Sequence, residues 1–200
     1  MSIRDGRKQA TRARVLSAAS ELFDELGFEA ATIRTIARRA GVSTGSVFTT
    51  FSGKTEIFHH VMEARLDTLY TELERIIPHL RGSTEDRLRS IMAVHYGFET
   101  RRIRLFVSYI SAAYGWAATA GETPLGRNAR LRSMLTDVLR EGQDRGEVRA
   151  DADLDLFVDT MVAAYFWNYR EASFDGGDAT RMIALMDRQI GLLFDGVAAR

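Results

Sequence analysis

Apolar residues recur every three or four positions over most of the chain, which is the spacing of one buried helix face. The first stripe runs from about Lys8 to Leu26 and ends at Gly27, a residue type that commonly terminates helices. Its apolar members are Val15, Ala18, Ala19, Leu22, Phe23 and Leu26. We expect this helix to form the back wall of a small N-terminal domain, with residues 1–7 as a loose arm before it.

Residues 32–51 have the pattern of two short helices joined by a tight turn. Thr32 precedes the first helix and Ser43 the second, and both residue types cap free helix amides. Gly41 gives the chain the freedom to leave the first helix sharply. The second helix, expected over 44–51, is too short to be stable alone. We therefore expect it to be held by the small core made of Phe28, Ile33, Ile36, Ala37, Val47 and Phe51.

The outer face of this second helix is small, uncharged and able to form hydrogen bonds. It carries Thr44, Gly45, Ser46, Thr49 and Thr50. A short helix with such a face suits insertion into the major groove of DNA, where Thr methyl groups contact thymine methyls. We expect these side chains to contact base edges or to make short phosphate hydrogen bonds.

The rest of the chain repeats the helical pattern. A long helix begins at Lys54 and ends near Ile77, before Pro78. Five further helices are expected, over about 84–99, 102–118, 125–144, 154–172 and 179–198, with a loop at Gly121–Pro124. The predicted fold is all-α with about nine helices. A three-helix helix-turn-helix DNA-binding domain, residues 1–56, is joined by the long helix to a C-terminal helical bundle, residues 57–200, to which a family resemblance assigns ligand binding and dimerisation.

The total charge is balanced, with 27 basic and 27 acidic residues, but its distribution is uneven. The first 14 residues contain five basic side chains and one acidic side chain, Asp5. Basic charge gathered at one end is typical of a surface that contacts phosphates, although a solvated basic tail is the simpler alternative. The chain has no Cys and no apolar run near the roughly 20 residues of a membrane span. We expect a soluble, cytoplasmic protein without membrane association.

Motifs for catalysis, metal binding and nucleotide binding are missing from the sequence. It contains no H-E-x-x-H, no G-x-S-x-G and no phosphate-binding glycine loop. The adjacent His59 and His60 would point about 100° apart on a helix, which does not suit a shared metal ion. We therefore expect neither enzymatic activity nor a cofactor.

Residues 11–62 resemble the N-terminal domain of the TetR family of bacterial transcriptional regulators. The matching positions are Thr32, Ile36, Ala37, Ala40, Gly41, Val42, Ser43, Gly45, Phe48, Phe51 and Lys54. The resemblance covers about a quarter of the chain, and the remainder fits the family only in length and helical pattern. Two departures stand out. The family usually has Tyr-x-Tyr-Phe where this chain has Phe48-Thr49-Thr50-Phe51, and Thr44 replaces a frequent basic residue.

The resemblance implies a ligand-responsive, sequence-specific DNA-binding regulator. We expect a repressor that a small effector releases from a palindromic operator in double-stranded DNA. Lys54 at a helix start is expected to contact phosphate. The full set of expected DNA contacts is Arg7, Lys8, Thr32, Arg34, Thr44, Gly45, Ser46, Phe48, Thr49, Thr50 and Lys54. Because the family's phenol hydroxyls and basic residue are missing, the alternative is a helical sensor or scaffold with weakened or no DNA binding.

The middle of the chain is rich in aromatic residues with polar tips, a composition that small-molecule cavities use. The resemblance places an effector pocket between the fifth and eighth helices. Its expected lining is His95, Phe98, Tyr109, Met134, Phe166 and Trp167. The alternative is that these residues form ordinary core. Effector binding would tilt the long helix and so change the spacing of the recognition helices.

The last two helices carry wide apolar faces, which the resemblance assigns to a homodimer interface. The expected interface residues are Phe157, Met161, Tyr165, Met186, Ile190, Leu193 and Val197. The alternative is that they close the core of their own domain. Reading a palindromic site with one recognition helix per half-site requires two copies of the chain.

Overall fold

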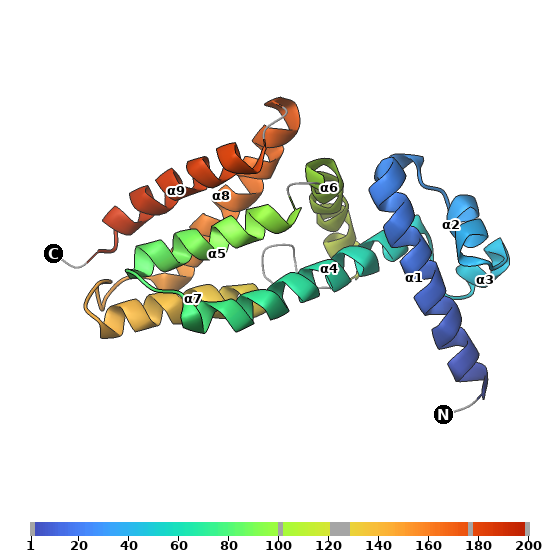
Figure 1. Ribbon diagram of the computed structural model, residues 1–200, viewed down its shortest axis with the longest axis horizontal. Coiled ribbons are helices and arrows are strands. Elements are labelled where there is room, and N and C mark those ends of the chain that lie inside the picture. Colours follow the sequence, from blue (N-terminus) through green and yellow to red (C-terminus); the bar gives the residue numbers. More distant parts are fainter. Residues whose placement is uncertain (1–2, 100–101, 121–128, 176–177, 199–200) are drawn as a thin grey trace. The chain divides into compact units, whose positions relative to one another are not determined.

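The computed structural model describes residues 3–99, 102–120, 129–175 and 178–198. These residues form nine α-helices, and the only β-type pairing among them is an isolated bridge between Val148 and Ala198 (Figure 1). The predicted all-α class is therefore confirmed. The loop expected at Gly121–Pro124 lies outside the described residues. None of the helices in the described ranges has an apolar stretch long enough to cross a bilayer.

The chain forms two compact units, unit 1 of residues 1–67 and unit 2 of residues 68–200. The division falls inside α4 (Lys54–Ile76). The sequence analysis sets the domain boundary earlier in this helix, after residue 56. Unit 1 therefore contains the first part of α4, and unit 2 contains its second part.

Unit 1 begins with a long helix, α1 (Ile3–Ala30), followed by α2 (Ile33–Ala40) and α3 (Thr44–Phe48). Residues 3–7 belong to α1, so the prediction of a loose arm over residues 1–7 is wrong for these positions. Asp5 in the first turn favours the helix there, because a carboxylate complements the positive end of the helix dipole. The chain leaves helical geometry at Gly27, with φ of 79°, and the helix resumes to Ala30.

The core of unit 1 is built on three phenylalanine rings. Phe23 packs edge-on against Phe58 with ring centroids 5.0 Å apart, and Phe28 lies 4.4 Å from Phe58. Four of the predicted core residues are buried, namely Ile36, Ala37, Val47 and Phe51. Phe28 and Ile33 are half-buried.

Ion pairs fix α2 and α4 to α1 in unit 1. Arg39 of α2 makes two hydrogen bonds of 2.9 and 2.8 Å to the carboxylate of Glu25, and Arg65 of α4 donates to Asp24 at 2.7 Å. The hydrogen bonds from Arg39 lower the pKa of Glu25. The helices that carry the turn motif are therefore held against α1 by charge as well as by the apolar core.

Unit 2 is a helical bundle of α5 (Thr84–Glu99), α6 (Ile103–Ala120), α7 (Ala129–Asp144), α8 (Leu154–Asp175) and α9 (Ala179–Asp195). A short 3-10 turn over Ile77–His79, which contains Pro78, ends α4. α5 packs against α7 and α9, and α8 packs against α6, α7 and α9 (Figure 1). Side-chain caps define the starts of three helices, from Ser83 to α5, from Asp153 to α8 and from Asp178 to α9.

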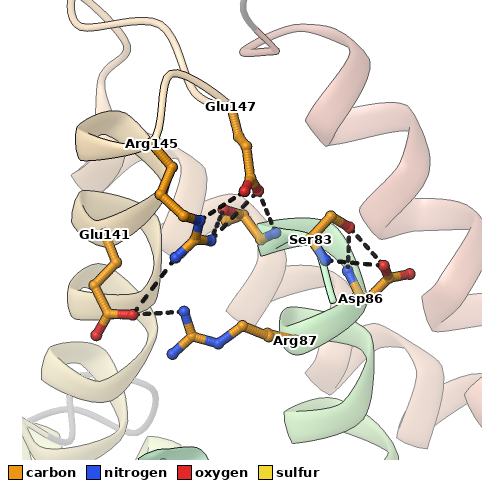
Figure 2. Close-up of polar contacts among 7 residues, drawn as sticks. Ser83, Asp86, Arg87, Glu141, Arg145 and Glu147 are labelled. Atoms are coloured by element: carbon orange, nitrogen blue, oxygen red, sulfur yellow. Dashed lines mark hydrogen bonds and ion pairs between the residues drawn. The ribbon is translucent and has the colours of Figure 1, made fainter. Parts of the chain in front are cut away.

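A polar cluster joins the start of α5 to the end of α7 (Figure 2). Arg87 donates to Glu141 at 2.5 Å, and Glu147 accepts the backbone N–H of Thr84 at 2.5 Å. Arg145 hydrogen-bonds Glu147 and lowers its pKa to about 2. The two helices meet closely at Gly142, where a Cβ atom would clash with the side chain of buried Thr84.

Candidate nucleic-acid interface

The turn between α2 and α3 is defined by backbone hydrogen bonds that follow directly from its sequence. Thr32 and Thr35 cap α2 reciprocally, each hydroxyl accepting the other residue's backbone N–H at 3.0 to 3.1 Å. Gly41 adopts the left-handed conformation, with φ of 64°. Its N–H and that of Val42 donate to the carbonyls of Arg38 and Ala37, the pattern that ends a helix sharply. The predicted helix-turn-helix is present.

α3 is braced from its inner side. Ser43 caps it by accepting the N–H of Ser46 at 3.1 Å. Val47 is completely buried, and Phe51 is 2% exposed. The guanidinium of Arg12 from α1 lies 4.7 Å from the centre of the Phe51 ring. A helix of this length has little stability of its own, so these contacts fix its position.

α3 ends at Phe48, three residues earlier than predicted. The carbonyl of Val47 accepts the N–H groups of both Thr50 and Phe51, at 2.9 Å each, and the bond from Thr50, only three residues on, is a turn rather than an α-helical bond. The hydroxyls of Thr49 and Thr50 donate to the carbonyl of Ser46 at 2.9 and 3.1 Å. Side-chain bonds of this kind compete with the helical ladder, which explains the early end.

The outer face of α3 and the turn after it carries the predicted contact residues. Thr44, Gly45 and Thr49 are exposed, while Ser46 and Thr50 are half-buried. Phe48 is also on the outside, with 58% of its surface exposed. The face therefore combines small hydroxyl residues with one large apolar ring and carries no charge.

The basic residues expected to contact phosphates differ in their exposure to solvent. Arg7 and Lys8 on α1 and Arg34 on α2 are exposed. Lys54 is half-buried, and its Nζ donates to the carbonyls of Phe28 at 2.8 Å and Glu29 at 3.2 Å. The same ammonium lies 4.2 Å from the centre of the Phe28 ring. Lys54 therefore joins the start of α4 to the end of α1, which sequence reasoning missed because the carbonyls are distant in the chain.

A second candidate site is a buried polar cluster in unit 2, formed by α5, α8 and α9. The Tyr165 hydroxyl lies 2.7 Å from His95 Nδ1, and both side chains are buried. Asn168 and Gln189 exchange two amide hydrogen bonds of 2.7 and 3.0 Å, and Asn168 also donates to the Tyr96 hydroxyl at 3.0 Å. Sequence reasoning missed Gln189, whose only signal is a polar residue beside the apolar stripe of α9.

Burial keeps this cluster uncharged. It lowers the pKa of His95 to about 4 and raises the pKa values of Tyr96 and Tyr165. No hydrogen-bond partner for His95 Nε2 is found among the described residues. A buried nitrogen without a partner is costly, so this atom is a place where an added polar group would be stabilising.

The predicted pocket residues are only partly brought together. His95 and Tyr109 are buried and linked through Phe106 and Tyr165, whose ring centroids lie 6.1 Å apart. Met134 of α7 is also buried, and Phe166 is half-buried. Phe98 and Trp167 instead face outward, Trp167 with 51% of its surface exposed and the Arg170 guanidinium 4.9 Å from its ring. Phe98 and Trp167 therefore lie on the surface of the single chain.

Most of the residues predicted for the dimer interface are buried within the single chain. This holds for Phe157, Met161, Tyr165, Met186 and Ile190, while Leu193 and Val197 are half-buried. A side chain without exposed surface has none to bury against a second copy. The five buried residues therefore close the core of unit 2, which was the alternative interpretation. The large apolar residues that these two helices expose are Leu156, Trp167 and Phe174 on α8 and Leu192 on α9.

The fold and the α2–α3 geometry define a helix-turn-helix transcriptional regulator. Residues 15–61 match the family model described as bacterial regulatory proteins, tetR family. This match assigns the segment that contains the helix-turn-helix to the TetR family of transcriptional regulators.

The relatives agree with this assignment. The chain is 29% identical over 152 residues to the HTH-type transcriptional repressor KstR2 of Mycobacterium tuberculosis strain H37Rv, a match that covers 76% of each chain. The solved structure of the ketosteroid transcriptional regulator KstR2 of Mycobacterium tuberculosis has a TM-score of 0.62 at 24% identity, covering 94% of this chain and 95% of that one. Thermus thermophilus FadR in complex with lauroyl-CoA has a TM-score of 0.70 at 23% identity, with 94% and 96% covered. The two solved structures share the fold.

Proposed function

We propose that this protein is a ligand-responsive repressor that binds a palindromic DNA operator as a homodimer and is released by a small apolar effector. The observation that carries the proposal is the braced α3, in which Val47 is buried, which is followed by the buried Phe51, and whose outer side is exposed. A recognition helix held in this way enters the major groove in helix-turn-helix proteins.

The proposed DNA contacts divide into two groups. Arg7, Lys8, Thr32, Arg34 and Lys54 anchor the protein to phosphates and carry little sequence information. Lys54 has two of its three N–H groups committed to carbonyls, which leaves one for a phosphate. The residues of the α3 face, Thr44, Gly45, Ser46, Phe48, Thr49 and Thr50, approach the base edges. A protein with this function would act in the cytoplasm, where bacterial DNA lies.

The second copy would pack on the exposed apolar residues of α8 and α9. Leu156, Trp167 and Phe174 follow one another on α8 at helical spacing, and Leu192 of α9 is 75% exposed. Apolar residues gathered on one face of a monomer are typical of an interaction surface. The α8–α9 face takes the place of the buried residues that the sequence analysis assigned to the interface.

The effector would bind in unit 2 beside the cluster of His95 and Tyr165. The neutral state of this cluster favours an uncharged polar group on an apolar ligand, because a buried charge without a partner is unstable. The similar protein KstR2 is a ketosteroid transcriptional regulator, and Thermus thermophilus FadR binds lauroyl-CoA in its solved structure. Both are consistent with an effector that has a large apolar part. Movement of α4, which has residues in both units, would carry the response to unit 1.

The test begins with the selection of bound duplexes from a random DNA library. The affinity for the selected duplex is then measured between 50 and 200 mM salt, where six or more phosphate contacts should change it about 10³-fold or more. Thr44→Glu places a negative charge on the exposed first turn of α3, where a carboxylate favours the helix but repels DNA. Thr180→Glu makes the same change in the first turn of α9 and serves as the matched control.

We expect Thr44→Glu to abolish operator binding without lowering the melting temperature, and Thr180→Glu to bind as the unmodified protein does. Selection of no duplex above the nonspecific background would contradict the proposal. It would favour the alternative of a helical sensor or scaffold without DNA binding, for which the missing charge on α3 is the supporting observation.

A further inference from the structure

We infer that Phe48 determines operator specificity by contacting the methyl group of a thymine in each half-site. The inference rests on the proposed function and names the chemistry that α3 recognises. Phe48 is the one large apolar side chain that the described part of α3 exposes, at 58% of its surface, while its neighbour Val47 is completely buried.

Position is the first argument. Phe48 lies four residues after Thr44, so the two side chains share one face of α3. Thr44 is exposed, and its methyl group adds to the apolar surface of the ring. The completely buried Val47 lies about 100° around the helix from Phe48, so the two side chains point to different sides of α3, and in the proposed complex the exposed Phe48 faces the groove. An exposed ring on the groove side is unfavourable in water and gains from an apolar partner.

The residue types on α3 provide the second argument. Bidentate hydrogen bonding to G uses Arg or Lys, and bidentate hydrogen bonding to A uses Asn or Gln. The segment 43–51, Ser-Thr-Gly-Ser-Val-Phe-Thr-Thr-Phe, contains none of these residues. The remaining apolar mode of major-groove reading is contact with the thymine methyl, for which Phe and Thr are suitable side chains.

The hydroxyl groups of Ser43, Ser46, Thr49 and Thr50 take part in internal hydrogen bonds, which is the third argument. Thr49 and Thr50 both donate to the carbonyl of Ser46. The hydroxyls of Ser43 and Ser46 lie 2.9 Å apart and bond to each other. The Thr49 and Thr50 donors would have to break internal bonds to reach a base edge, whereas the Phe48 ring loses no bond on contact. Apolar contact is therefore the mode of reading that this helix is prepared for.

Replacing thymine with deoxyuridine tests the inference directly. Deoxyuridine keeps the pairing and every hydrogen-bonding group of thymine and lacks only the 5-methyl group. Each thymine of the selected operator would be replaced symmetrically in both half-sites, and affinities would be measured by fluorescence anisotropy. The proteins are the full chain and its Phe48→Ala, Phe48→Tyr and Thr44→Ser variants.

For the unmodified protein we expect one symmetric position at which the replacement weakens binding roughly fifteen-fold, which is about fourfold for each buried methyl group. Phe48→Ala should bind the thymine operator more weakly and be insensitive to the replacement at that position. Phe48→Tyr keeps the ring and should keep the sensitivity. Thr44→Ser removes the threonine methyl alone and should leave the position sensitive, which separates the ring from its neighbour.

Tight binding that tolerates deoxyuridine at every position would overturn this inference and leave the proposed function intact. Equal sensitivity of Phe48→Ala and the unmodified protein would also overturn it. If no duplex were selected at all, the proposed function would fail and the inference with it. Phe48 is largely exposed, so its variants should fold, and a melting curve for each variant checks this.

Discussion

The hydroxyl of Tyr165 on α8 lies 2.7 Å from Nδ1 of His95 on α5, and both side chains are shielded from solvent. Burial lowers the pKa of His95 from 6.5 to about 4. In the unfolded chain the imidazole takes up a proton as the pH falls through about 6.5, while the folded protein does so only near 4. The unfolded state thus binds more protons within this window.

Stability should therefore fall as the pH is lowered from 6.5 towards 4. The lowering of the His95 pKa from 6.5 to about 4 corresponds to about 3 kcal/mol in the free energy of unfolding. Urea unfolding across this range would measure the loss in the unmodified protein and in His95→Gln. The variant lacks the titrating imidazole, so its free energy of unfolding should fall less over this pH range, by that same amount. Parallel profiles would show that His95 does not remain neutral in the fold.

Lys54 should contribute to folding as well as to DNA binding. Lys54→Met removes the two hydrogen bonds to the carbonyls of Phe28 and Glu29 and should lower the free energy of unfolding by about 1–2 kcal/mol. Because one N–H remains for a phosphate, the salt slope of operator binding should also fall by about one unit. Urea titration and salt-dependent anisotropy measure the two effects.

The matched control for Lys54 is Lys8, the only other lysine of the chain, which is exposed on α1. Lys8→Met should reduce the salt slope without changing the melting temperature. An unchanged slope for Lys54→Met would remove Lys54 from the phosphate contacts. An unchanged unfolding midpoint would show that its bonds to α1 do not stabilise unit 1.

Gly142 should be intolerant of any side chain. Its Cα faces the buried Thr84 at the junction of α5 and α7, beside the cluster shown in Figure 2. Gly142→Ala should destabilise the protein by about 1–3 kcal/mol through overpacking. The control is Gly97→Ala in α5, where an added Cβ meets no atom and should stabilise the helix by about 0.5–1 kcal/mol. Thermal unfolding that ranks the two variants in the opposite order would contradict the packing described at this junction.

Leu192 should be essential for the dimer and unimportant for folding. Leu192→Glu places a charge on the exposed face of α9, where burying it against a second copy would be strongly unfavourable. Sedimentation velocity should then show a monomer that retains the helical content of the parent. Leu26→Glu changes an exposed leucine of α1 in unit 1 and should leave the dimer intact. A dimer that survives Leu192→Glu would rule out the proposed face.

The helix-turn-helix could be predicted because its signals are local. Thr32, Gly41 and Ser43 act through hydrogen bonds to residues three or four positions away, so their effect does not depend on the rest of the fold. The length of α3 was overestimated for a related reason. Its end depends on whether the Thr49 and Thr50 hydroxyls bond to the backbone or point outward, and both options are compatible with the same sequence.

The faces of α8 could not be assigned from the sequence. Apolar residues surround this helix on nearly every side, with Phe157, Met161 and Tyr165 inward and Leu156 and Trp167 outward. Periodicity distinguishes an apolar face from a polar one, but it cannot separate two apolar faces that have different partners. This is why Trp167 was expected in a pocket and Tyr165 in an interface, whereas the fold places Tyr165 against His95.

The sequence by itself determined the all-helical class, the turn at Gly41 and the family, because each depends on residues close together in the chain. Tertiary structure alone decided that Lys54 meets the end of α1, that His95 meets Tyr165, and which apolar residues of α8 and α9 stay exposed. The contacts of Lys54 and of His95 join residues 25 or more positions apart. Their formation is governed by how whole helices pack, and no local spacing encodes that arrangement.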